Sequence, residues 1–405
     1  MASGWNQTYG GPASEACYSA IETSDGGYTL VGRTYSFGAG DSDIWLVKID
    51  SFGNLEWNKT FGTQGYEEAN HLTSTDDGSY IIVGTITPYG LDYRDVWIIK
   101  TDSTGSILWN KTFGGKGDDK PWRIIETSDK GYAVVGRTDS YGKGSTDCWL
   151  FKTDSSGNIQ WNTTFGGIQV ESARGILETS DNGFLITGWS SSFGAGKLDY
   201  WLVKTDENGN HEWNKTYGGT ENERAITTIP TNDGNYITVG NTASFGRGET
   251  DIYLVKTDNF GNIIWNNTYG GASAETPFDI IETVDGGYGI TGHSYSFGVG
   301  ENDIWLIKVD QSGNMIFNQT FGGEMADSSR TIFEDSNGGY VIAGSSFSFG
   351  QGEDDFWLIK TYASAVEDST YETESETESE LDSGIPSFPI LSIITALGIY
   401  YLFRK

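Results

Sequence analysis

The segment Trp161-Asn-Thr-Thr-Phe-Gly-Gly167 decides the fold, because close copies of it return at a fixed interval along the chain. Seven copies begin at positions 5, 57, 109, 161, 213, 265 and 317, each 52 residues after the one before, without an insertion or a deletion. A fixed period of this order is typical of β-propellers and repeat arrays. We therefore expect the chain of 405 residues to be dominated by one repeat domain, although its length alone would suggest several domains.

The fourth unit shows the pattern of one repeat. Four short runs of aromatic and β-branched residues, separated by turns rich in Asp, Asn and Gly, predict strands at residues 172–178, 184–190, 199–205 and 211–217. No helical periodicity lies between them. The sequence therefore predicts an all-β fold, a seven-bladed β-propeller of 52-residue, four-stranded repeats.

The two ends of the repeat region predict how the ring closes. The chain begins with an isolated fourth strand around Trp5, and its last unit stops after a third strand at residues 355–361. The next copy of the repeated segment is due at position 369, which is Ser369. We expect the N-terminal strand to complete the last blade, because ring closure leaves no strand edge unpaired. The propeller is expected to span residues 1–362.

Several motifs follow one another within the units: Thr-Phe-Gly-Gly, an acidic residue, Asp-Gly-Gly-Tyr, Gly-x-Thr-x-Ser-Phe and Asp-x-Trp-Leu-x-Lys-x-Asp-x-x-Gly-Asn. This pattern resembles the archaeal and bacterial β-propeller repeat called the SBBP repeat, and its last part also resembles the repeats of quinoprotein-type propellers. The resemblance covers residues 1 to about 362. It implies a propeller fold and a place on the cell surface.

The chain after the repeats has a different composition. Residues 363–384 are rich in Ser, Thr and Glu, with eight acidic and no basic side chains from Glu367 to Asp382, which predicts a disordered stalk. Residues 385–403 form an uncharged apolar run long enough to cross a bilayer, followed by the basic residues 404–405. We expect a C-terminal transmembrane helix with its basic end in the cytoplasm and the propeller outside the cell.

Pro386-Ser-Phe388, the apolar run and the basic end also resemble the three-part C-terminal sorting signals of archaeal surface proteins. Residues 385–403 are therefore expected to be either a membrane anchor or such a sorting signal. At the other end, Met1-Ala-Ser-Gly4 leads straight into the first repeat without the basic and apolar regions of a signal peptide. The expected export then requires either a start further upstream or an unusual route.

The composition limits the partners and the chemistry. A net charge of −31 argues against nucleic acid, which needs a basic surface, but does not by itself select another partner. For a module at the cell surface, we expect a protein or a glycan as the partner. Cys17 and Cys148 fall in different strands two units apart, which predicts two buried thiols and no disulfide. His71, His211 and His293 lie at unrelated positions, so neither a catalytic triad nor a zinc centre is indicated.

Three polar positions recur in all seven units, as Glu171, Asp199 and Lys204 do in the fourth. Seven copies around a ring do not make one active site, so we interpret them as ion pairs and turn hydrogen bonds that hold each blade together. The turn Asp206-Glu-Asn-Gly-Asn210 offers oxygen ligands to Ca²⁺, but its spacing does not complete an EF-hand loop. No cofactor or metal ligand is therefore assigned, and Ca²⁺ stays an open alternative.

An Asn-x-Thr sequon recurs on each predicted outer strand, directly after an aromatic residue that faces the other side. In an exported chain these sequons predict N-glycosylation at the outer rim. The alternative is that they are by-products of repeat duplication that merely stabilise the strand. The seven asparagines are Asn6, Asn58, Asn110, Asn162, Asn214, Asn266 and Asn318.

Ligand specificity is expected where the units differ. One variable position follows the Gly of the second strand and carries Arg33, Thr85, Arg137, Trp189, Asn241, His293 and Ser345. The other lies in the first strand and carries Tyr18, Asn70, Trp122, Arg174, Ile226, Phe278 and Arg330. Aromatic and basic side chains around a ring mouth suit a sugar or an acidic glycan, and we assign ligand binding to Trp122, Arg137 and Trp189. Drift on an unselected surface would give the same variation, so this alternative stays open.

The sequence contains no nucleophile motif, phosphate-binding loop or zinc pattern. It predicts a cell-surface, membrane-anchored β-propeller that acts as a binding or envelope-structural module and is not an enzyme. The alternative is a propeller enzyme, either a sialidase-like glycoside hydrolase or a quinone-dependent dehydrogenase, with its site at the central funnel.

Overall fold

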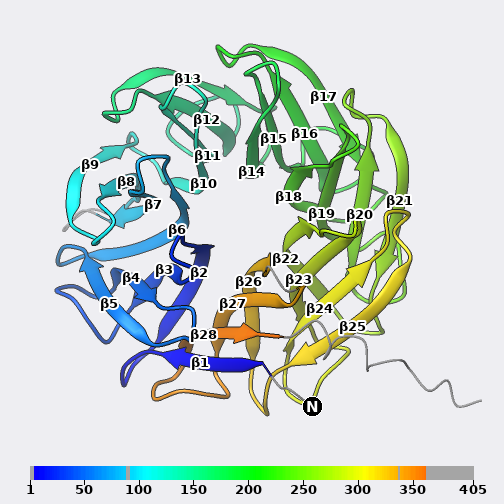
Figure 1. Cartoon of the computed structure of the whole chain (residues 1–405). Coiled ribbons are helices and arrows are strands. Elements are labelled where there is room, and N and C mark those ends of the chain that lie inside the picture. The colour runs from blue at the N-terminus through cyan, green and yellow to red at the C-terminus, as the bar shows by residue number, and fades with distance from the viewer. Residues whose placement is uncertain (1–3, 88–91, 336–337, 362–405) are drawn as a thin grey trace, which may run out of the picture. The chain divides into compact units, whose positions relative to one another are not determined.

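The computed structural model describes residues 4–87, 92–335 and 338–361, and in these ranges the chain forms 28 β-strands and no helix. The strands form seven four-stranded antiparallel sheets, arranged as the blades of a ring (Figure 1). In each blade one strand lies at the centre of the ring and the other three follow outward. The all-β, seven-bladed propeller predicted from the repeat is therefore confirmed.

The innermost strands are β2 (Glu15–Glu22), β6 (Tyr66–Ser74), β10 (Asp119–Glu126), β14 (Glu171–Glu178), β18 (Glu223–Pro230), β22 (Glu275–Glu282) and β26 (Asp327–Glu334). The second strands are β3 (Tyr28–Thr34), β7 (Tyr80–Thr87), β11 (Tyr132–Thr138), β15 (Phe184–Ser190), β19 (Tyr236–Thr242), β23 (Tyr288–Ser294) and β27 (Tyr340–Ser346). The third strands are β4 (Asp43–Ile49), β8 (Asp95–Thr101), β12 (Asp147–Thr153), β16 (Asp199–Thr205), β20 (Asp251–Thr257), β24 (Asp303–Val309) and β28 (Asp355–Lys360). The outermost strands are β5 (Leu55–Phe61), β9 (Ile107–Phe113), β13 (Ile159–Phe165), β17 (His211–Tyr217), β21 (Ile263–Tyr269), β25 (Met315–Phe321) and β1 (Trp5–Tyr9).

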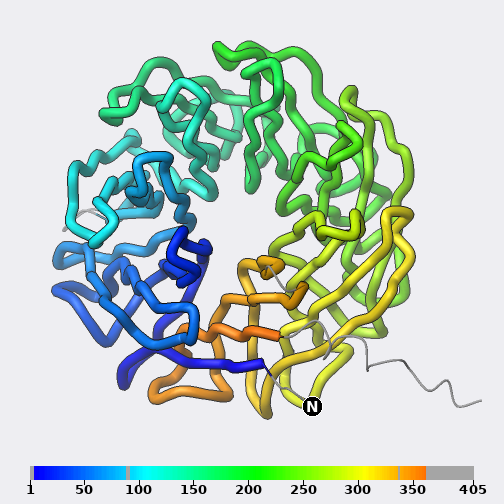
Figure 2. The backbone as a smooth tube through the Cα atoms, viewed as in Figure 1, coloured from blue at the N-terminus to red at the C-terminus, as the bar shows by residue number. Residues whose placement is uncertain are grey.

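The first strand of the chain closes the ring. β1 pairs with β28 in antiparallel register, from Trp5 opposite Lys360 to Tyr9 opposite Phe356, so the last blade has the order β1-β28-β27-β26. Figures 1 and 2 show the blue N-terminal strand beside the orange strand β28. The predicted closure by the N-terminal strand is confirmed, and β28 has a partner on both sides.

Each blade is buried in its middle and exposed at its outer edge. All residues of β16 are buried, whereas β17 begins with exposed residues. The buried faces of neighbouring blades pack on each other, and the rings of Trp45 in the first blade and Phe356 in the last lie 4.8 Å apart. Cys17 and Cys148 are free and buried in such faces, as predicted. Because burying one large apolar side chain contributes about 1.5–3 kcal/mol, these interfaces hold the ring together.

The repeated acidic residue of the innermost strand holds the loop that joins two blades. The buried carboxylate of Glu171 accepts hydrogen bonds from the Gly167 N–H at 2.7 Å and from the Ser190 hydroxyl at 2.9 Å. A Cβ at Gly166 would lie 2.0 Å from Oδ1 of Asp147, so this position has no room for a side chain. The first Gly of the repeated Gly-Gly pair is thus a packing requirement of the blade junction.

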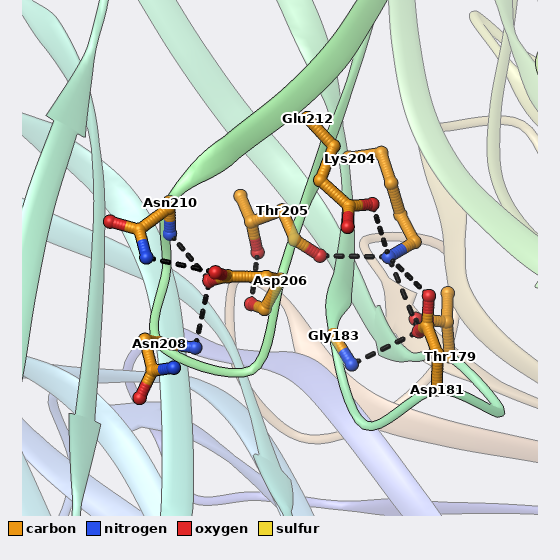
Figure 3. Close-up of polar contacts among 9 residues, drawn as sticks. All are labelled: Thr179, Asp181, Gly183, Lys204, Thr205, Asp206, Asn208, Asn210 and Glu212. Carbon is orange, nitrogen blue, oxygen red and sulfur yellow. Dashed lines mark hydrogen bonds and ion pairs between the residues drawn. The ribbon is translucent and has the colours of Figure 1, made fainter.

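The repeated Lys lies in an ion-pair network at the other end of the blade (Figure 3). Nζ of Lys204 lies 3.0 Å from a carboxylate oxygen of Asp181 and 3.0 Å from one of Glu212. It also donates to the Thr205 carbonyl at 2.8 Å. Equivalent Lys–Asp pairs occur in the other blades, for example between Lys48 and Asp25. These contacts confirm the structural role that the sequence predicted for this Lys.

The Asp206 turn, considered above for Ca²⁺, uses its carboxylate within the turn itself. The oxygens accept hydrogen bonds from the backbone N–H groups of Asn208 and Asn210, at 2.9 and 2.8 Å, and from the Asn210 amide at 2.8 Å (Figure 3). Within the described ranges, no three His, Cys, Asp or Glu side chains are grouped so as to hold a metal ion. The assignment of no metal and the alternative of Ca²⁺ both stay predictions.

The predicted stalk and anchor lie outside the described residues. This holds for the acidic residues 363–384, for the apolar run 385–403 and for the basic end 404–405. Among the residues that are described, no helix is long and apolar enough to span a membrane. The C-terminal transmembrane helix therefore stays a prediction from the sequence.

Candidate functional site in the central channel

Every innermost strand carries a β-bulge near its start. In each blade the pairing with the second strand skips one residue, as between Cys17 and Ser19 of β2. The skipped residues, here named the bulge residues, are Tyr18, Asn70, Trp122, Arg174, Ile226, Phe278 and Arg330. A bulge redirects a side chain out of the regular ladder. All seven bulge residues line one cavity of about 540 Å³, the central channel, whose wall consists of innermost strands.

Two arginines among the bulge residues stack on aromatic rings. The guanidinium carbon of Arg174 lies 3.5 Å from the ring centre of Trp122, and that of Arg330 lies 4.0 Å from the ring centre of Phe278. Arg330 also lies 5.5 Å from the ring centre of Tyr18. A cation over the face of an aromatic ring is attracted to it, so these contacts hold the long arginine side chains in place.

The carboxylate of Glu68, on β6, is paired with neighbouring cations and a hydroxyl group. Lys120 Nζ lies 2.6 Å from one oxygen, the Tyr66 hydroxyl donates to the other at 2.9 Å, and Arg33 lies 3.9 Å away. Burial opposes ionisation of Glu68, but the charge and hydrogen bond of Lys120, together with Tyr66 and Arg33, lower its pKa below the usual value. Glu68 is therefore an ionised partner of the surrounding cations.

Next to the bulge residues, Arg123 reaches across the channel. From β10 its Nη1 donates to the Thr227 hydroxyl of β18 at 2.5 Å, and its Nη2 lies 3.8 Å from the Asp279 carboxylate of β22. Asp279 also accepts a hydrogen bond from the Ile332 N–H at 3.2 Å, and burial raises the pKa of this carboxyl. The two contacts of Arg123 tie together blades that are not neighbours in the ring.

Further along the innermost strands the channel wall becomes apolar. Ile21, Ile229, Ile281 and Phe333 lie toward the ends of their strands and line this part of the cavity. The channel therefore changes along its axis, from aromatic and cationic side chains where the innermost strands begin to aliphatic and aromatic side chains where they end. The cations that could pair with an anionic group lie at the end of the channel where the innermost strands begin.

The structure separates the three residues to which the sequence analysis assigned ligand binding. Trp122 is a bulge residue and lines the channel. Arg137 and Trp189 lie on the second strands β11 and β15, opposite Lys120 and Ser172 of the innermost strands. Both are half-buried, and neither is among the residues that line the described cavity. They therefore flank the channel wall, whereas Trp122 forms part of it.

Arg174, Arg330 and Arg123 were not among the ligand-binding residues predicted from the sequence. Arg174 and Arg330 occupy the variable first-strand position, which was one of two positions that vary among the units. The signal that distinguishes this position is the β-bulge, and residue types alone do not show a bulge. Arg123 belongs to a segment of the third unit that departs from the other units, and this departure was the available signal.

The predicted sequons lie on the outermost strands, where their asparagines make a structural contact. In five blades the indole N–H of a third-strand Trp donates to the Asn Oδ1, as from Trp45 to Asn58 at 3.3 Å. The other four pairs are Trp97–Asn110, Trp201–Asn214, Trp305–Asn318 and Trp357–Asn6. Six of the seven asparagines are exposed, and Asn318 is half-buried. The contact gives these residues a role that needs no glycan, and N-glycosylation stays a prediction.

No family model matches the chain. Among curated proteins, the regulatory protein FlaEY of Caulobacter vibrioides is 27% identical over 172 residues, which are 36% of this chain and 18% of that protein. The chain therefore spans less than a fifth of the length of this relative. The resemblance to SBBP repeats remains a prediction from the repeated motifs.

Several solved structures are similar to the chain at low sequence identity. YCF48 bound to D1 peptide matches with a TM-score of 0.53 and 12% identity, over 89% of this chain and 96% of that one. Puromycin hydrolase matches with a TM-score of 0.52 and 12% identity, over 82% of this chain and 50% of that one. The WD40 domain of Neurospora crassa Pan2 matches with a TM-score of 0.51 and 10% identity, over 89% and 97%. At these identities the similarity shows the fold alone, and with the sheet topology it identifies the chain as a seven-bladed β-propeller.

Proposed function

We propose that this protein is a non-catalytic binding module that receives a segment of a partner protein in its central channel. The ring of bulge residues carries the proposal. Its seven backbone positions are equivalent, yet they present Tyr, Asn, Trp, Arg, Ile, Phe and Arg to one cavity. In contrast, the Asp that opens each third strand recurs in every blade. The residues that hold the blades together are the same in every unit, whereas the residues that line the channel differ from unit to unit. This combination suits a single ligand that presents a different group to each blade.

The charged groups of the channel support binding more than catalysis. Its two carboxylates, on Glu68 and Asp279, each lie within ion-pair distance of a cation and so have structural partners in the channel wall. Burial, followed by the charge of Arg123, keeps the pKa of His71 well below its usual value. The fold similarity to YCF48, whose structure contains a bound peptide, supports a peptide segment as the ligand.

Selection of a random peptide library on the purified protein tests the proposal. Trp122→Ala and Phe278→Ala remove half-buried rings that line the channel, and Phe52→Ala removes a ring that is 76% exposed on a turn. We expect selected peptides to bind the wild type and Phe52→Ala alike, and to bind the two channel variants at least tenfold more weakly. Peptides that bind all variants equally would place the ligand elsewhere. Channel-dependent turnover of a glycoside or a quinone-linked substrate would favour the enzyme alternative.

We further propose that the propeller is displayed outside the cell, glycosylated at its seven sequons and attached to the membrane through residues 385–403. The support is the exposure of the asparagines on the outermost strands and the composition of the C-terminal region. Mass spectrometry of the native protein, combined with protease accessibility in intact cells, tests this placement. Seven unmodified asparagines on a protein protected inside the cell would refute it.

A further inference from the structure

Among the described residues, no carboxylate lies at ion-pair distance from Arg174 or Arg330, although the charge of Glu68 acts on Arg330 from further away. In the part of the chain that the structure describes, neither guanidinium forms an ion pair or a hydrogen bond, and Nε of Arg174 is buried without a partner. The neighbouring cations Lys120 and Arg123 each have a carboxylate partner. The two bulge arginines are held only by contacts with aromatic rings.

Other cations lie close enough to both arginines to act on their charges. Burial, followed by the charges of Arg330, Arg137 and Arg224, lowers the pKa of Arg174 to about 9, so it is still protonated at neutral pH. Burial likewise lowers the pKa of Arg330. The cations therefore gather at one end of the channel in a chain whose net charge is −31. An anion bound between them would relieve their mutual repulsion.

The stacked arrangement leaves hydrogen-bonding groups free for a ligand. At 3.5 Å from the Trp122 ring centre, the guanidinium of Arg174 uses its face for the aromatic contact. The N–H groups of a guanidinium lie along its edge, in a fork that matches a carboxylate or another oxyanion. Arg330, 4.0 Å from the Phe278 ring centre, has the same kind of contact. Both arginines line the same cavity.

We propose that Arg174 and Arg330 form an anion-binding site that takes the carboxylate side chains of an acidic peptide. This inference rests on the proposed function and names the class of ligand that the channel receives. The guanidinium groups bind the carboxylates, and the exposed parts of the Trp122 and Phe278 rings contact the aliphatic part of the peptide. The apolar wall at Ile229 and Ile281 then receives any hydrophobic residue that precedes or follows the acidic ones.

Calorimetric titration with tetraglutamate tests the site directly. The variants are Arg174→Gln, Arg330→Gln and their combination, and Arg247→Gln is the matched control because Arg247 is exposed on a loop. We expect the wild type and Arg247→Gln to bind alike, each channel variant to bind at least tenfold more weakly, and the combination to lose binding. Sodium sulfate should compete in the wild type, because sulfate is an oxyanion that a guanidinium can also bind. Arg174→Lys, which keeps the charge but not the fork, should lie between the wild type and Arg174→Gln.

Two results would overturn the inference: equal tetraglutamate affinity of the wild type and the double variant, or no tetraglutamate binding to the wild type. Thermal melting checks the fold, and we expect the Gln variants to melt no lower than the wild type because they remove unbalanced charge. The peptide selection separates the two proposals. Selected peptides that depend on Trp122 but neither contain Asp or Glu nor depend on the two arginines leave the proposed function standing and the anion site refuted. Selected peptides that bind the wild type, Trp122→Ala, Phe278→Ala and the two arginine variants alike refute both.

Discussion

Trp357 donates its indole N–H to Oδ1 of Asn6 at 3.3 Å, a bond that joins the last described strand of the chain to the first. The two strands also pair along the whole of β1, from Trp5 to Tyr9. The other six blades are each built from consecutive strands, so the ring is closed only where these ends meet. Its integrity therefore depends on a strand of five residues.

Deletion of residues 1–9 is expected to open the ring. It leaves β28 with one unpaired edge and uncovers Trp357 and Phe356. Lost backbone hydrogen bonds contribute about 1 kcal/mol each and the lost burial of Trp5 and Tyr9 about 1.5–3 kcal/mol each, so the total rivals the stability of a whole domain. We expect a lower melting temperature and self-association on gel filtration. Deletion of residues 363–405 serves as the control and should leave the melting temperature unchanged.

Gly166→Ala is expected to destabilise the fold more than Gly234→Ala. The new Cβ at Gly166 would overlap the Asp147 carboxylate, whereas at Gly234 it would meet no atom within 4 Å but would sit at a positive φ of 80°. A left-handed backbone costs an L-residue about 1–2 kcal/mol, and overpacking a buried site costs about 1–3 kcal/mol or more. Urea unfolding of both variants measures the difference. Equal losses would show that the blade junction has room for a methyl group.

The turn carboxylates paired with the repeated Lys predict a loss of stability in acid. Hydrogen bonds from Thr23 and Gly27, together with Lys48, lower the pKa of Asp25 to about 2. The folded-state pKa lies below the value of about 3.9 expected for an unfolded chain. The contribution is therefore fully present above about pH 4 and is lost as the pH falls toward 2. The urea midpoint should fall over this window, and it should fall less in Asp25→Asn.

Asp95 is expected to change stability with pH in the opposite direction. Burial, followed by the charge of Asp119, raises the pKa of Asp95, so its ionised form opposes folding and stability is lost as the pH rises through the raised value. Its Oδ1 is buried without a partner. Asp95→Asn mimics the protonated form and should therefore be more stable than the wild type at pH 7. A variant less stable than the wild type at that pH would contradict this account.

The cross-channel pair of Arg123 and Asp279 predicts coupled effects on stability. Arg123→Met removes the cation and leaves the buried Asp279 carboxylate without it. Breaking a buried ion pair costs about 3–5 kcal/mol, and the 3.8 Å separation favours the low end. Adding Asp279→Asn should recover part of the loss. A double-variant cycle by chemical denaturation measures this coupling, and purely additive losses would show that the two side chains act independently.

The sequons can be tested apart from the hydrogen bond that their asparagines accept. Thr60→Ala removes the sequon of Asn58 but keeps the Trp45–Asn58 bond, whereas Asn58→Gln removes both. Both variants should lose one glycan in the native host, as read by mass spectrometry. Only Asn58→Gln should also lose about 1 kcal/mol of stability when both are expressed without glycosylation. A wild type without any glycan at Asn58 would leave only the structural role.

The fold could be predicted because the features that determine it can be read directly along the sequence. The 52-residue period gives the number of blades, and the isolated strand at Trp5 together with the unfinished unit at residues 355–361 gives the closure. Tight packing explains why the repeated segment is so uniform, since a Cβ at Gly166 would overlap a neighbour. These features needed no knowledge of distances.

The site could be predicted only in part, because it depends on local backbone geometry and on the radius of the ring. The variable positions of Trp122 and Trp189 look equivalent in the sequence, yet only Trp122 lies at a bulge and lines the channel. The contact of Arg123 with Thr227 and Asp279 spans the ring, and no spacing along the chain shows which blades face each other at that distance.

The bulges separate the side chains that line the channel from the residues that pair the strands of each blade. A bulge residue is not paired with a residue of the second strand, so replacing its side chain leaves the backbone pairing of the sheet unchanged. The seven positions lie around one axis, and those whose side chains touch, such as Arg174 with Trp122 and Arg330 with Phe278, act together. If Glu replaced both Arg174 and Arg330, this part of the channel would carry carboxylates instead of cations, and under the proposed function it would favour basic over acidic segments.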